Sequence, residues 1–133
     1  MIVKIFEGHW TINDVRTNKN FLFIFGDNDV KRGKGGQATI RDEPNAIGIP
    51  TKKFPDMREY SFYTDRELKT NIIGINVAYN NIINKLRTKK YLGIVLPNGG
   101  IGTGLADLPK RAPITFAYLQ KIIDCIKNEC MEM

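Results

Sequence analysis

Four stretches of the chain have hydrophobic patterns typical of β-strands. Every residue from Phe21 to Phe25 is hydrophobic, which indicates a central strand that is buried on both faces and ends at Gly26. Leu92 to Leu96 has the same character and is followed by Pro97. Ile2 to Phe6 alternates hydrophobic and polar residues, which predicts an outer strand. Ala46 to Thr51 predicts a further short strand.

Two longer segments have helical periodicity. From Leu68 to Leu86, hydrophobic residues recur at steps of three and four, which predicts one helix of roughly twenty residues with a single buried stripe. The preceding Thr64 to Glu67 has the spacing of a capping box. A last helix is expected after Pro113, and Gln37 to Arg41 is expected to form a short one. Helices that alternate with apolar strands predict a layered α/β domain. In the last helix the residues expected to face inward are Leu119, Ile122, Ile123 and Ile126.

Composition narrows the class of protein. A chain of 133 residues with 42% hydrophobic and 26% charged residues is expected to form one globular domain over residues 1–133. It has no apolar run long enough to span a membrane and no apolar leader at its N-terminus, so we expect a soluble, cytoplasmic protein. Cys125 and Cys130 are poorly spaced for a disulfide within a helix. With His9 as the only histidine, we expect no metal site and no cofactor.

The two most apolar predicted strands each lead into a glycine-rich turn. Gly99 to Gly104 holds four glycines in six residues, a composition that lets successive main-chain amides converge on a phosphate. The turn from Gly33 to Gly36 matches neither a Walker loop nor a dinucleotide fingerprint. It is either a flexible surface loop or a turn that lets the main chain approach a ribose or a base. Because open α/β sheets bind ligands at the carboxyl ends of their strands, the two turns are expected to form two walls of one cleft.

Two charged residues near these turns are candidates for catalysis. Lys52 follows the strand from Ala46 to Thr51, where partial desolvation would lower its pKa and free a nucleophilic amine. The alternative is an ordinary surface lysine. Asp107 follows the second turn and could be a general acid or base, or the cap of a helix.

Taken together, these segments resemble the macro-domain superfamily, whose members bind ADP-ribose. The nearest branch is that of the terminal ADP-ribose protein glycohydrolases. The resemblance runs from about residue 21 to residue 128 and depends on order and spacing. The matching segments are Gly33-Lys34-Gly35, Pro50-Thr51-Lys52-Lys53, the helix from Asp65, and Leu96-Pro97 followed by Ile101-Gly102-Thr103-Gly104-Leu105. The last segment is the most specific of the four.

The resemblance implies a three-layer α/β/α macro-like domain with a mixed, largely parallel central sheet. It implies that Lys52 attacks the anomeric carbon of a ribose with help from Asp107, although this aspartate comes one residue later than in the family. In that family a G-D pair holds the adenine amino group, a role open here to Glu7 or Asp27. The ligand-binding residues that the resemblance implies are Asp27, Asn28, Gly33, Gly35, Gly36, Gly100, Ile101, Gly102, Thr103, Gly104 and Leu105.

Three functional hypotheses follow. The first is a module that binds ADP-ribose, a related nucleotide or an ADP-ribosylated macromolecule, with hydrolysis of an ADP-ribosyl bond as a secondary hypothesis. The second is a sponge or sensor without turnover, for a modified or cyclic nucleotide signal. The third, motivated only by the net charge of +6, is a nucleic-acid-binding domain. In that case stacking rings would come from a group of aromatic residues that could equally form a lid over a nucleotide or belong to the core, namely Phe54, Tyr60, Phe62 and Tyr63.

Overall fold

The computed structural model describes residues 1–88 and 90–133. Within them, four strands form one sheet in the order β1–β4–β2–β3, and every pairing is parallel. The strands are β1 (Ile2–Phe6), β2 (Phe21–Asn28), β3 (Ala46–Lys52) and β4 (Gly93–Pro97). The expected layered α/β architecture is confirmed, but the expectation of a mixed sheet is wrong. Helical crossovers return each strand to the same direction, which is the ordinary way to join parallel neighbours.

The two strands predicted to be buried on both faces, β2 and β4, are the inner ones. The side chains of Phe21 to Phe25 are all buried, and β2 pairs with both β4 and β3. β1 lies at one edge of the sheet and is largely exposed, as its alternating pattern predicts. β2 extends through Asn28, beyond the end predicted at Gly26, because Asp27 and Asn28 continue the pairing with β3.

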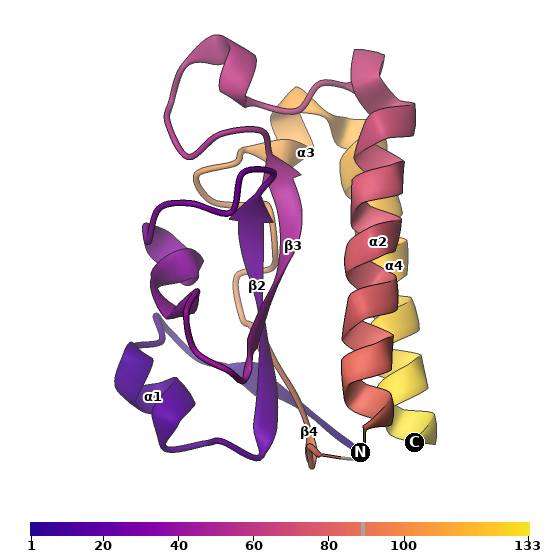
Figure 1. The fold of residues 1–133 in the computed structure, drawn as a ribbon. Coiled ribbons are helices and arrows are strands. Elements are labelled where there is room, and N and C mark those ends of the chain that lie inside the picture. Colours follow the sequence, from indigo (N-terminus) through magenta and orange to yellow (C-terminus); the bar gives the residue numbers. More distant parts are fainter. Residues whose placement is uncertain (89) are drawn as a thin grey trace.

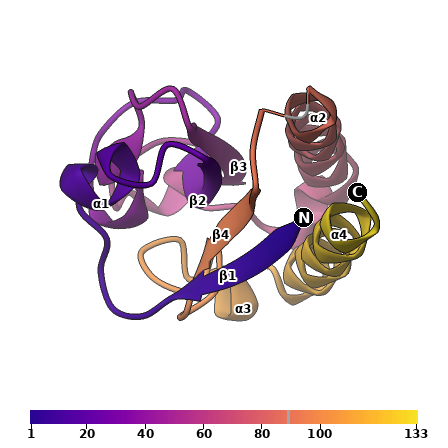
Figure 2. The ribbon, with the colours of Figure 1, turned by 90° about the horizontal axis from the view of Figure 1, so that it is seen from below.

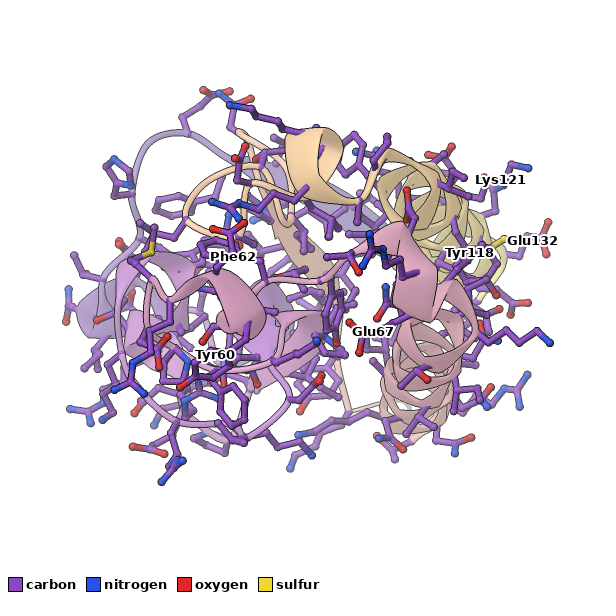
Figure 3. All side chains as sticks on the ribbon, turned by 90° about the horizontal axis from the view of Figure 1, so that it is seen from above. Tyr60, Phe62, Glu67, Tyr118, Lys121 and Glu132 are labelled. Carbon is purple, nitrogen blue, oxygen red and sulfur yellow. The ribbon has the colours of Figure 1, made fainter. Side chains whose placement is uncertain are left out.

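One face of the sheet is covered by the two long helices α2 (Leu68–Arg87) and α4 (Pro113–Glu132), which lie side by side (Figure 1). Both helices pack their hydrophobic stripes against the sheet. The buried residues of α2 and α4 in this core are Ile75, Ala78, Ile82, Ile83, Leu86, Leu119, Ile122, Ile123, Ile126 and Cys130. The predicted helix and its inward-facing residues are therefore confirmed. Tyr118 of α4 donates a hydrogen bond to Asn76 of α2 and ties the two helices together (Figure 3).

The opposite face carries shorter elements, α1 (Ile12–Arg16) and the 3₁₀ helix Gly36–Ile40 (Figure 2). They cover a second core that includes Trp10, Val15, Phe23 and Ile40. Helical elements on both faces of the sheet make the fold a three-layer α/β/α arrangement. α1 was not predicted from the sequence, because five residues are too few for a periodic pattern to emerge.

The predicted capping box before α2 is wrong. Thr64 makes no capping hydrogen bond, and residues Asp65–Glu67 form a 3₁₀ turn that leads into α2. The carboxylate of Asp65 instead accepts hydrogen bonds from the main-chain amides of Ile114 and Thr115, both at 2.9 Å. These amides belong to the first turn of α4, so Asp65 caps a helix that is distant in the sequence.

The two cysteines do not pair with each other, as their spacing predicts. Cys130 is buried, Cys125 is exposed and both are free. α3 (Leu108–Arg111) is a single short turn between the second glycine-rich turn and α4. No helix in the described part of the chain combines the length and hydrophobicity that a membrane crossing requires.

Candidate functional site

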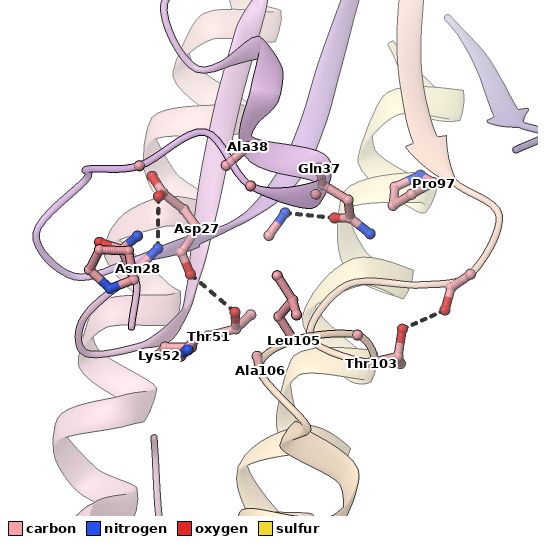
Figure 4. A pocket seen from close by; sticks show the side chains of 18 of the residues that line it. Asp27, Asn28, Gln37, Ala38, Thr51, Lys52, Pro97, Thr103, Leu105 and Ala106 are labelled. Atoms are coloured by element: carbon pink, nitrogen blue, oxygen red, sulfur yellow. Dashed lines mark hydrogen bonds between the residues drawn. The ribbon is translucent and has the colours of Figure 1, made fainter. Parts of the chain in front are cut away.

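A cavity of about 640 Å³ opens at the carboxyl ends of β2, β3 and β4. Its walls are the two glycine-rich turns, so the predicted cleft between them is present (Figure 4). The predicted site residues that line it are Asp27, Asn28, Gly33, Gly35, Gly36, Lys52, Gly102, Thr103, Gly104 and Leu105. Gly100, Ile101 and Asp107 are not among the lining residues. Ile101 points into the core on the α2 and α4 side and is only 1% exposed.

The second glycine-rich turn presents an unusual run of free amides. Within the described chain, the N–H groups of residues 101 to 106 donate to no protein acceptor. The turn keeps its shape through other contacts: Thr103 Oγ1 donates to the carbonyl of Gly99 at 2.6 Å, and the amide of Leu108 donates to the carbonyl of Gly102 at 2.9 Å. Five of these six residues, Gly102 to Ala106, line the cavity, and main-chain amides without a protein acceptor beside a cavity suit an anion.

Gly102 occupies a position of this turn that a larger residue cannot readily take. Its φ of +82° lies in the left-handed region. A β-carbon there would lie 3.1 Å from Leu108 Cδ2 and 3.2 Å from Thr51 Cγ2. The turn can therefore approach the end of β3 only with glycine at this position.

Gln37 joins the two turns and was not predicted as a site residue. Its Oε1 accepts from the amide of Gly26 at 2.9 Å (Figure 4), and its Nε2 donates to the carbonyl of Gly100 at 2.8 Å. Its own main-chain carbonyl accepts from Trp10 Nε1 at 3.0 Å. A glutamine in a glycine-rich stretch has no spacing signal of its own, so only the fold reveals these contacts.

The polar residues at the end of β2 shape the first glycine-rich turn. Asn28 Nδ2 donates to the carbonyl of Arg32 at 2.7 Å, and Arg41 Nε donates to the carbonyl of Gly33 at 2.9 Å. Arg41 also pairs with the carboxylate of Asp27 at 2.6 Å, and both side chains are largely buried. Asp27 and Asn28 therefore line the cavity while their side chains already hold protein partners.

The two turns face each other across the mouth of the cavity. β-carbons built on Gly35 and Gly36 would lie 3.8 and 3.9 Å from Leu105 Cδ1. The Leu105 side chain is 61% exposed and projects into the space between the turns (Figure 4). An exposed leucine at this position supplies an apolar contact at the rim.

Lys52 is the best-enclosed cation of the cavity and is only 6% exposed. Its ammonium group donates to the carbonyl of Asp56 and lies 4.4 Å from the centre of the Phe62 ring. Burial lowers the pKa of Lys52, and the nearby Arg111 guanidinium lowers it further, whereas Asp56 acts in the opposite direction. The prediction of a desolvated lysine at the end of this strand is therefore supported by its surroundings, and the alternative of a surface lysine is wrong.

Asp107 has a different environment. It adopts a left-handed conformation with φ of +47°, and its Oδ2 lies 3.6 Å from Arg111 Nε. Among the described residues, no hydrogen bond or ion pair joins Asp107 to Lys52. Asp107 occupies the N-cap position of α3, but its side chain makes no capping hydrogen bond. The structure thus brings Lys52 to the cavity and leaves Asp107 paired with Arg111 outside its lining.

The far end of the cavity lies beside the residues that follow β1. Gly8, His9 and Trp10 line it there. Glu7 does not line the cavity, and its carboxylate accepts a hydrogen bond from Asn98 Nδ2 at 2.9 Å. His9 is exposed at the rim, whereas Trp10 is buried. Glu7 therefore links the end of β1 to Asn98, just before the second turn. His9 is the exposed side chain at this end of the cavity.

The aromatic residues after β3 divide into core and surface. Phe62 and Tyr63 are buried, at 1% and 3% exposure. Tyr60 is 55% exposed and stacks edge-on against Phe54, with ring centroids 5.9 Å apart (Figure 3). The Arg111 guanidinium carbon lies 3.6 Å from the centre of the Phe62 ring. The Phe62 ring therefore contacts two cations, Arg111 and Lys52.

A model of a family of unknown function (DUF7831) matches residues 5–122. The chain belongs to this family. The part matched by the DUF7831 model includes every residue that lines the cavity. No curated protein and no solved structure matches the chain.

Proposed function

We propose that the cavity binds an ADP-ribose-type nucleotide, free or attached to a macromolecule, with its diphosphate on the second glycine-rich turn. The observation that carries this proposal is the run of free amides at residues 101 to 106 beside the cavity. Main-chain amides with no protein acceptor are available to donate to a ligand, and those of the buried residues Ile101, Gly102 and Ala106 need a partner most, because buried amides are nearly always paired. A diphosphate offers several acceptor oxygens to such a run.

The charge of the cavity supports an anionic ligand. Lys52 and Arg32 line it, and the carboxylate of Asp27 is already neutralised by Arg41. The chain as a whole carries a net charge of +6, which favours approach of a diphosphate. The volume of about 640 Å³ lies within the usual range for small-molecule sites, roughly 300–1,000 Å³.

The shape of the cavity supports an extended ligand with groups on both sides of the diphosphate. In the sheet order β1–β4–β2–β3, Lys52 ends β3 at one edge and Gly8 to Trp10 follow β1 at the other, while the second turn follows β4 between them. ADP-ribose has this layout, with an adenosine on one side of the diphosphate and a second ribose on the other. The resemblance to macro domains assigns the second ribose to the Lys52 end.

Calorimetric titration with ADP-ribose, AMP and ribose 5-phosphate tests the proposal. We expect ADP-ribose to bind most tightly, because only it reaches both ends of the cavity. Gly104 supplies a matched pair of variants, since a β-carbon there meets nothing within 4 Å. Gly104→Asp introduces a negative charge beside the diphosphate and should abolish binding, whereas the similarly sized Gly104→Asn should retain most of it. No heat with ADP-ribose, or equal affinity of the two variants, would overturn the proposal.

Hydrolysis of an ADP-ribosyl bond is a second candidate function, favoured by one observation. Lys52 presents a largely buried amine of lowered pKa to the cavity, as a nucleophile requires. Chromatography of an ADP-ribosylated peptide after incubation should show released ADP-ribose with the wild type and none with Lys52→Ala. Asp107→Asn should have little effect, because Asp107 pairs with Arg111 instead of facing the cavity. Recovery of unchanged bound nucleotide from the wild type would favour a sponge or sensor.

We further propose that the protein acts in the cytoplasm. Both cysteines are free, and reducing compartments keep thiols in this state. Microscopy of a fluorescent fusion tests this proposal, and signal confined to another compartment would contradict it.

A further inference from the structure

The side-chain amide of Gln37 contacts both β2 and the second glycine-rich turn. One end of the amide accepts from Gly26 N–H at 2.9 Å, and the other donates to the Gly100 carbonyl at 2.8 Å. A β-carbon built on Gly26 would lie 3.3 Å from Gln37 Oε1 and 3.6 Å from Gly102 N. The amide is thus closely packed between the strand and the turn, and Gly26 leaves the space that it occupies.

The hydrogen bond to Gly100 fixes the start of the free-amide run. A peptide group is planar, so its carbonyl and its N–H point in opposite directions. When Gln37 holds the carbonyl of Gly100, it also sets the direction of the Ile101 N–H, the first of the amides without a protein acceptor. The same contact occupies a carbonyl oxygen that would repel an anion if it turned toward the cavity.

We propose that Gln37 is a positioning residue of this site. It anchors the peptide between Gly100 and Ile101, and thereby holds the amides of the lining residues Gly102 to Ala106 in the orientation that receives a phosphate group. This inference rests on the proposed function for the identity of the ligand. The orientation of the turn itself can be measured without any ligand.

Two substitutions separate the roles of the amide. Gln37→Met keeps the length of the side chain and removes both amide contacts. Gln37→Glu keeps an acceptor for Gly26 N–H but places an anionic oxygen against the carbonyl of Gly100. Once protonated, that carboxyl group again has one acceptor and one donor, like the amide. Both variants retain the main-chain carbonyl of Gln37 and its hydrogen bond from Trp10.

Affinity for ADP-ribose as a function of pH is the first measurement. At pH 7.5 we expect both variants to bind about tenfold more weakly than the wild type, as after loss of a hydrogen bond that leaves a partner unsatisfied. At pH 5 the Gln37→Glu variant should recover toward the wild type measured at the same pH, and Gln37→Met should not. The comparison at equal pH is needed because other titratable and charged side chains face the same cavity, namely His9, Asp27, Arg32 and Lys52. Loss of affinity without this recovery would overturn the proposal.

The second measurement is of the backbone ¹⁵N order parameters of residues 101 to 106 in the protein without ligand. We expect them to fall in Gln37→Met and to stay at wild-type values in Asn45→Ala. The latter variant controls for general destabilisation, because Asn45 Nδ2 donates to three main-chain carbonyls outside the cavity lining. Unchanged order parameters in Gln37→Met would overturn the positioning role. Failure of the wild type to bind ADP-ribose would instead overturn the proposed function and leave this measurement to decide the role of Gln37.

Discussion

The ammonium group of Lys52 donates a hydrogen bond to the main-chain carbonyl of Asp56, four residues further along the chain. The segment after β3 thus folds back over the lysine and removes it from solvent. Because burial penalises the charged form, the pKa of Lys52 is lowered. We expect its ¹³Cε resonance to titrate below the ordinary lysine value of about 10.4 in NMR spectra.

The lowered pKa of Lys52 also makes the free energy of unfolding depend on pH. As pH rises toward the ordinary lysine value, Lys52 loses its proton in the folded protein before it does so in the unfolded chain. The unfolded state then binds more protons, so the contribution of Lys52 to the free energy of unfolding increases with pH in this window. Lys52→Met should remove that contribution, whereas Lys121→Met, on the outer side of α4, should leave it (Figure 3). A Lys52 resonance that titrates at or above the ordinary value would contradict the prediction.

Asp65 is expected to stabilise α4 from a distance. Burial raises the pKa of its carboxyl group, but hydrogen bonds from Ile114 and Thr115 lower it more, and the net shift is downward. The stabilisation is therefore complete at neutral pH and is lost as pH falls through the lowered pKa. Urea unfolding at pH 7 should show that Asp65→Ala costs about 1 kcal/mol, as for loss of a helix cap. At pH 3 the difference from the wild type should shrink.

A matched control for this cap is available on α4 itself. Asp124 is exposed on the same helix, and Asp124→Ala should change the free energy of unfolding by less than about 0.5 kcal/mol. Equal losses from the two alanine variants, or a loss at Asp65 that does not depend on pH, would refute the capping role.

Two glycines of the second turn should respond differently to the same substitution. Gly102→Ala places a β-carbon at positive φ, at 3.1 Å from Leu108 Cδ2, and should lower the free energy of unfolding by about 1–2 kcal/mol. Gly104→Ala meets nothing within 4 Å and should be close to neutral. Thermal unfolding of both variants checks this, and an equally stable Gly102→Ala would mean that the turn tolerates a side chain there.

The ion pair between Arg41 and Asp27 should matter more than a surface pair. The two side chains are 11% and 7% exposed, and Arg41 also donates to the carbonyls of Gly33 and Arg32. Arg41→Leu leaves a buried carboxylate without its partner and should cost about 3 kcal/mol in chemical unfolding. Arg41→Lys keeps the charge but loses the forked geometry, so an intermediate loss is expected. A loss below about 1 kcal/mol for Arg41→Leu would indicate that Asp27 finds other partners.

The elements that could be predicted are those whose signal lies within one segment. β2 and β4 carry runs of hydrophobic residues, and the hydrophobic stripe of α2 repeats over several turns. Such patterns favour a strand or a helix whatever element they pack against. The capping box at Thr64 failed although its spacing was correct, because a competing partner exists. The carboxylate of Asp65 found the free amides at the start of α4, which no local pattern reveals. The role of Asp107 also depended on competition, because its carboxylate pairs with Arg111 one helical turn later and makes no capping hydrogen bond.

The sequence by itself determined which segments become strands and helices, which of them are inner, and where glycine permits unusual main-chain conformations. These properties depend on hydrophobic periodicity and on φ preferences, which act over a few residues. The tertiary structure alone decided that Gln37 reaches Gly100, that Lys52 is covered by the segment after β3, and that the amides from residue 101 to residue 106 face no protein acceptor. Each of these depends on which groups come within hydrogen-bonding reach of one another. That is decided only when the sheet has formed, so no pattern over a few residues predicts it.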